Sequence, residues 1–173
     1  MTDPYIVVFA TGRCGTLYLS KVLQAAGLDC HHESLGKNGG VGWPMLTKVE
    51  RLPPNARRIL LIRNPVECVA SLQTFSPMHW RNAGCYMKLP NERVHRAMTY
   101  WLTWNRRCSV FAQHVVKLCD LEKSDAAFGL TLPWGAVKRT TNHRQHKALT
   151  WADLEQAHKQ TAAECREYWE TLI

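Results

Sequence analysis

The stretch that decides the fold runs from Ile6 to Leu19 and reads IVVFATGRCGTLYL. Its first part is apolar and β-branched, which is typical of a buried strand. A short loop with Gly12 and Gly15 follows, and an amphipathic helical pattern begins directly after it. This order aims backbone N–H groups and the positive end of a helix dipole at one point. It predicts an anion-binding loop with Arg13 and Thr16 as side-chain donors, although an ordinary tight turn explains the loop alone equally well.

The loop matches neither of two common nucleotide-binding patterns. It is too short for Gly-x-x-x-x-Gly-Lys-Ser/Thr and has no lysine after its second glycine, which disfavours a kinase or an ATPase. The dinucleotide pattern Gly-x-Gly-x-x-Gly is absent as well. The pattern that remains is a phosphate loop whose basic residue, Arg13, comes early.

A second motif follows the apolar run 58–62, which reads as a buried parallel strand. Pro65 suits the first position of a helix, and the helical pattern continues over 66–75. Arg63 then lies at the carboxyl end of a strand, where open α/β sheets bind ligands, and Ser71 is on the helix that follows. Such a pair can hold a second phosphate. The alternative is an arginine at the sheet edge and a serine buried in a helix.

Taken together, the two motifs resemble the cofactor signatures of the sulfotransferases that use 3′-phosphoadenosine 5′-phosphosulfate (PAPS). In that family the loop after the first strand holds the 5′-phosphosulfate. The resemblance assigns this role to Arg13, Cys14, Gly15, Thr16 and Leu17. In the second signature an arginine at a strand end and a serine eight positions on hold the 3′-phosphate.

The resemblance assigns the 3′-phosphate to Arg63 and Ser71, and softer similarity extends over most of the chain. It also marks Asn142 and Arg144, in a loop near the C-terminus, as weaker cofactor contacts. The chain departs from the family at Asn64, where Asp is usual, and at Cys14, where Ser is common. The terminal loop also lacks the Arg-Lys-Gly form of the cytosolic small-molecule enzymes.

The alternation of strand and helix patterns predicts a parallel sheet with right-handed crossovers. The resemblance implies a single sulfotransferase-like domain over 1–173, with a three-layer α/β/α fold of the P-loop nucleoside triphosphate hydrolase type. It implies an enzyme that moves a sulfuryl group from PAPS to a hydroxyl or amine of a small molecule or glycan. A kinase-like phosphotransferase and a non-catalytic nucleotide-binding module remain as alternatives.

Sulfuryl transfer needs a base near the acceptor and a cation near the departing bisphosphate. Arg13 is predicted to be the cation. Candidates for the base are Glu33, then His32, then His31, at the carboxyl end of a predicted second strand over 28–33. Strand alternation would place His31 and Glu33 on one face and His32 on the other, if the strand runs that far. The chemistry requires no metal.

The net charge of +8 favours anionic partners, and a polyanionic cofactor accounts for it economically. The basic residues form no block, and no nucleic-acid-binding signature is found. Seven cysteines without a Cys-x-x-Cys motif predict reduced thiols and a cytoplasmic protein rather than a disulfide framework. The sequence predicts no signal peptide and no membrane partner.

Other sequence features point to further alternatives. Cys30, the two histidines after it, His143 and His146 match no standard zinc spacing. Cys14 is a conceivable thiolate nucleophile, but the phosphatase pattern, with an arginine six residues later, fails. The glycine-rich segment 36–42 is predicted to be mobile, and 76–90 to be a long irregular connection. Two tryptophans that are predicted to lie in loops are candidates for an acceptor-binding rim, Trp43 directly after the first segment and Trp80 within the second.

Overall fold

The computed structural model describes residues 4–138 and 146–172. The chain divides into two compact units, one formed by 1–62 and 107–143 and the other by 63–106 and 144–173. The first unit contains the sheet, and the second is helical in its described part. The expectation of a single sulfotransferase-like domain over 1–173 stays a prediction.

The first unit is built on a five-stranded sheet in the order β2-β3-β1-β4-β5, and every neighbouring pair is parallel. Its central strands β1 and β4 carry the longest runs of buried apolar residues, because both faces of a parallel sheet are covered. The predicted α/β class with a central parallel sheet is therefore confirmed. The strands are β1 (Ile6–Phe9), β2 (Cys30–His32), β3 (Gly39–Gly42), β4 (Arg57–Ile62) and β5 (His114–Lys117).

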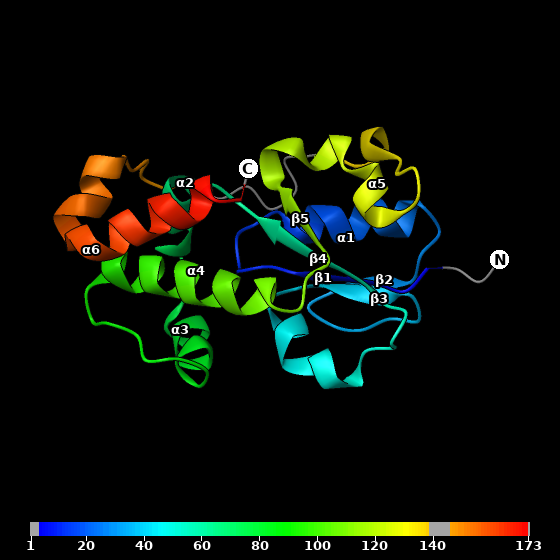
Figure 1. The fold of residues 1–173 in the computed structure, drawn as a ribbon, viewed down its shortest axis with the longest axis horizontal. Helices are drawn as coiled ribbons and strands as arrows, with labels where there is room; N and C mark the ends of the chain where they lie inside the picture. The colour runs from blue at the N-terminus through cyan, green and yellow to red at the C-terminus, as the bar shows by residue number, and fades with distance from the viewer. Residues whose placement is uncertain (1–3, 139–145, 173) are drawn as a thin grey trace. The chain divides into compact units, whose positions relative to one another are not determined.

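Helical segments cover this sheet from both sides. Helix α1 (Thr16–Ala25) packs against β2 and β3, and the 3₁₀ helix η1 (Trp43–Arg51) packs against β1 and β3. Figure 1 shows α1 and η1 on opposite sides of the strands. The arrangement within this unit is consistent with a three-layer α/β/α fold. The unit also contains η2 (Leu118–Lys123), α5 (Asp125–Phe128) and η3 (Trp134–Ala136).

The glycine-rich segment, which we expected to be mobile, forms the buried strand β3 between β2 and β1. The packing requires its glycines. A Cβ atom on Gly39 would lie 1.8 Å from the carbonyl oxygen of Ile6, and one on Gly40 would lie 2.2 Å from that of Ser34. Gly39 also has φ +121°, which side chains rarely permit. The mobile-loop prediction was wrong because glycine strands carry no apolar signal.

Strand β5 is short and is followed directly by a 3₁₀ helix. Strand β5 ends at Lys117, and η2 takes up the residues after it. Val116 is buried, whereas Val115, on the opposite face of this edge strand, is 42% exposed. The predicted second strand is shorter than expected and ends at His32.

The second unit contains α2 (Pro65–Leu72), α3 (Pro77–Gly84), α6 (Trp151–Glu170) and most of α4 (Arg93–Ser109). The indole N–H of Trp101 in α4 donates to the carbonyl of Arg63, 3.1 Å away, which ties α4 to the start of α2. Helix α2 packs against α6. Helix α3 occupies most of the segment that we expected to be irregular, so that prediction was wrong.

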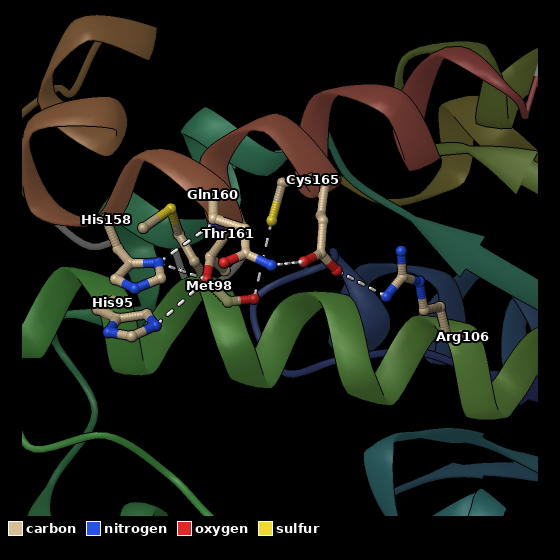
Figure 2. Close-up of polar contacts among 8 residues, drawn as sticks. His95, Met98, Arg106, His158, Gln160, Thr161 and Cys165 are labelled. Carbon is tan, nitrogen blue, oxygen red and sulfur yellow. Dashed lines mark hydrogen bonds and ion pairs between the residues drawn. The ribbon is translucent and has the colours of Figure 1, made fainter.

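Helix α6 is broken at His158, which has extended backbone angles of φ −165° and ψ 99°. The Nδ1 atom of His158 lies 2.8 Å from the hydroxyl of Thr161 and accepts from its backbone N–H at 3.3 Å, as a cap would for the second half of the helix. Figure 2 shows His158 face to face with His95 of α4, and their ring centroids are 3.8 Å apart. The Thr161 hydroxyl also lies 3.2 Å from Nε2 of His95. The break thus lies in a packed contact between α4 and α6.

Candidate functional site

The strand order makes the carboxyl ends of the central strands β1 and β4 a candidate ligand site. From β1 the chain crosses to β2 on one side, whereas from β4, which pairs with β1, it crosses to β5 on the other side. In open α/β sheets, ligands bind outside the carboxyl ends of strands at such a reversal. The reversal lies between β1 and β4, the two strands that the predicted phosphate motifs follow in sequence.

The loop after β1 has an unusual backbone conformation. Arg13 and Gly15 have φ values of 69° and 75°, so two residues in close succession adopt the left-handed conformation. Alternating left- and right-handed residues turn successive N–H groups toward a common centre. Gly15 is the N-cap of α1, and the first turn of α1 contains no acidic residue. The positive end of this helix is therefore not neutralised within its own first turn.

His32 joins this loop through Thr16. The Thr16 hydroxyl lies 3.0 Å from Nε2 of His32, and Thr16 is buried. Burial lowers the pKa of the His32 imidazole below its ordinary value, and the Glu33 carboxylate opposes that shift. The imidazole is therefore neutral near pH 7, and its ring is available as a proton acceptor.

Glu33 lies beside His32 rather than on the face of His31. Strand β2 ends at His32, and Glu33 adopts the left-handed conformation with φ 59°. Its Oε1 atom lies 3.8 Å from Nε2 of His32. The predicted alternation does not hold here, because the chain turns where the alternation would have continued.

His31 has a different partner. Its Nε2 atom lies 2.6 Å from Oδ1 of Asp29, and both side chains are about half exposed. The backbone N–H of Lys37 and, more weakly, His31 lower the pKa of Asp29. Of the three base candidates, the structure brings His32 and Glu33 together and directs His31 to Asp29.

Cys14 is fully buried in the loop, and its thiol lies 2.9 Å from the hydroxyl of Thr11, which is buried as well. A catalytic thiolate needs an accessible sulfur atom. This burial argues against the thiolate alternative and makes the Cys14–Thr11 contact an internal support of the loop.

The second motif lies in the helical unit. The Nε atom of Arg63 lies 3.1 Å from Oε2 of Glu67, one helical turn on. Asn64 caps α2 by accepting from the backbone N–H groups of Val66 and Glu67, so the amide takes the capping role that Asp would fill. Ser71 is buried and lies one turn beyond Glu67, on the same face of α2.

The remaining predicted contacts, Asn142 and Arg144, lie outside the described residues, as does His143 of the zinc alternative. Within 4–138 and 146–172, no group of three or more His, Cys, Asp or Glu side chains is arranged to hold a metal ion. Within the same ranges, no helix is long and apolar enough to cross a membrane.

Two residues of this region were missed by the sequence reasoning. Thr11 lay inside the loop motif but was not selected, since nothing in the pattern distinguishes a buried hydroxyl from an exposed one. Glu67 had a readable signal, because an acidic residue four positions after an arginine at a helix start predicts an ion pair.

Comparison of the chain with models of known protein families found no match, and comparison with curated proteins found none either.

Proposed function

We propose that this protein is a PAPS-dependent sulfotransferase with a three-layer, P-loop-like α/β/α fold. The observation that carries the proposal is the loop after β1, where Arg13 and Gly15 are left-handed and Thr16 contacts His32. An anion cradle and a neutral base at one edge of a sheet are what transfer of an anionic group to a hydroxyl requires. The resemblance of the two motifs to the sulfotransferase signatures supplies the choice of cofactor.

The residues present fit such a cofactor. The loop offers backbone N–H groups from left-handed turns and the N-terminus of a ten-residue helix without an acidic first turn. In the proposal, the residues from Arg13 to Leu17 hold the 5′ end. Arg63 and Ser71 bind the 3′-phosphate, and Arg63 exchanges its Glu67 partner for that phosphate.

When bound, PAPS supplies the sulfuryl group that the acceptor receives. His32 takes the proton of the acceptor hydroxyl or amine, for which burial keeps its imidazole neutral. Glu33, 3.8 Å from His32, stabilises the imidazolium that results. The guanidinium of Arg13 offsets the negative charge that develops on the leaving bisphosphate. Thr16 fixes the orientation of the His32 ring through its hydroxyl contact.

The two phosphate assignments can be separated with matched ligands. Calorimetric titrations would compare adenosine 3′,5′-bisphosphate with adenosine 5′-monophosphate, which lacks the 3′-phosphate. Arg13→Ala should weaken both ligands, and Arg63→Ala should weaken only the bisphosphate, by about tenfold or more, because a charge-assisted hydrogen bond is lost. Arg51→Ala, an exposed arginine of η1, is the control.

Equal losses for the two ligands in Arg63→Ala would contradict the assignment of Arg63 to the 3′-phosphate. Unchanged affinity in Arg13→Ala would contradict the role of the loop. A protein that binds the bisphosphate but transfers no sulfuryl group from labelled PAPS to any hydroxyl or amine acceptor would be a non-catalytic module.

A further inference from the structure

We propose that the helical unit has a second binding site, which takes a small organic anion built on a flat ring. The site is a pocket of about 450 Å³ between α3 and the start of α4, both labelled in Figure 1. This volume lies within the range of small-molecule sites. All lining residues belong to the second unit, so the proposal does not depend on the phosphate loop or on sulfuryl transfer.

The pocket is positively charged. Three of its lining residues are cations, Arg81, Lys88 and Arg96, and none of the lining residues that the structure describes is acidic. Arg81 and Lys88 are exposed and form no ion pair with a described residue. The acidic residue next in the chain, Glu92, is directed elsewhere, because its carboxylate accepts from backbone N–H groups in the first turn of α4. An anion in the pocket therefore meets positive charge that no lining residue neutralises.

Arg96 is already fixed in position. Its Nε atom donates to the carbonyl of Pro90 at 2.9 Å, and one Nη2 hydrogen is directed to the carbonyl of Asn91. Its Nη1 atom has no partner among the described residues and is left to bind a ligand. A guanidinium that is held before binding loses less conformational entropy when an anion docks.

The indole ring of Trp80 forms a flat side of the pocket and is held in place by its neighbours. Its ring packs edge-on against Tyr100, with centroids 5.9 Å apart, and at a tilt against Phe75, with centroids 5.3 Å apart. The guanidinium of Arg96 lies over the indole, 5.7 Å from the centroid. An aromatic ring supported by two others offers a rigid stacking surface beside a fixed cation.

The ligand class follows from this combination. The acidic group of the ligand binds to the guanidinium and ammonium groups, and a flat ring lies along Trp80. A bare inorganic ion would leave the indole ring without a contact, and a neutral ring would leave the positive charge of the three cations without a counter-charge. We therefore assign the pocket to a ring that carries one acidic group, such as an aromatic carboxylate.

The test measures the binding of three probes to the intact chain. Calorimetry gives the affinity, and backbone amide shifts in NMR spectra give the location. Naphthalene-2-carboxylate has both ring and charge, naphthalene-2-carboxamide has the ring alone, and inorganic phosphate has the charge alone. The carboxylate should bind at least about tenfold more tightly than either, with shifts at Trp80 and Lys88. Equal affinity for carboxylate and carboxamide would overturn the proposal.

Substitutions of lining residues test whether the carboxylate binds in this pocket. Arg81→Ala and Lys88→Ala alter exposed side chains and should keep the native circular dichroism spectrum, while together they weaken carboxylate binding by about tenfold or more. Lys159→Ala, which removes an exposed charge from α6, is the matched control and should bind as the wild type does. Loss of binding in Arg13→Ala, or an equal loss in the control, would overturn the assignment to this pocket.

Discussion

The hydroxyl of Thr16 lies 3.0 Å from Nε2 of His32, and this contact joins the N-terminus of α1 to the carboxyl end of β2. It places an ionisable ring directly against the loop that we propose to bind the anionic end of the cofactor. Through this contact the loop has a titratable side chain beside it in the same unit. A βα turn with a purely structural role does not need one.

The ionisation of His32 should depend on its burial and on Glu33. NMR titration should give His32 a pKa below the ordinary histidine value, because burial disfavours the imidazolium. Glu33→Gln should lower the His32 pKa further, since it removes the negative charge that opposes the shift. An increase of the His32 pKa in that variant would contradict the described geometry.

The pH dependence of transfer follows from the same group. His32 acts as the base only when neutral, so activity should be present above its depressed pKa and fall as the pH drops through that value. His32→Gln should reduce sulfuryl transfer by about 10²–10⁴-fold while bisphosphate affinity changes little. A variant that retains full transfer would exclude His32 as the base.

Glu67 should weaken anion binding at Arg63. Its carboxylate holds the Arg63 Nε at 3.1 Å and must be displaced by an incoming phosphate. Glu67→Gln should therefore raise the affinity for adenosine 3′,5′-bisphosphate about twofold, in keeping with the modest strength of an exposed ion pair. Glu155→Gln, which breaks the Arg166–Glu155 pair on α6, is the control for a lost surface carboxylate. A reduced affinity in Glu67→Gln would show that Glu67 helps to hold the ligand.

Gly39 should be the least replaceable glycine of the sheet. Gly39→Ala puts a Cβ atom 1.8 Å from the Ile6 carbonyl at φ +121°, so backbone must move, and we expect a loss of about 3 kcal/mol or more in the free energy of unfolding. Gly27→Ala is the matched control, because Gly27 also has positive φ but open space around it, and should cost about 1 kcal/mol. Chemical denaturation of both variants measures the difference. Equal losses would contradict the close pairing of β3 with β1.

The parts of the fold that could be predicted from the sequence were those that leave a clear pattern of apolar residues. Strands β1 and β4 and helices α1 and α2 were predictable because continuous apolar runs end at glycine or proline. Strand β3 was not, since its glycines are required by a close backbone approach that only the folded chain reveals. The pairing of Glu33 with His32 was hidden for a similar reason, because a left-handed glutamate leaves no trace in a pattern of alternation.

The stacked pair of His95 and His158 should make stability fall at acid pH. Burial, and then the proximity of His158, lower the pKa of His95, so the unfolded chain binds a proton more readily than the folded chain does. This contribution is present above the unfolded pKa and is lost as the pH falls through the folded one. The unfolding temperature should therefore drop between about pH 7.5 and about pH 5.5, and should drop less in His95→Gln. His114→Gln, an exposed histidine on β5, is the control. An unchanged pH dependence in His95→Gln would remove this pair as a cause.

The measurement that tests the central claim most directly is a calorimetric titration of the whole chain with adenosine 3′,5′-bisphosphate, with ATP and magnesium as the comparison. The account predicts saturable, one-to-one binding of the bisphosphate that is much tighter than binding of ATP with magnesium. Binding of ATP instead would favour a kinase-like phosphotransferase, and binding of neither would contradict the assignment of the two motifs to phosphate groups.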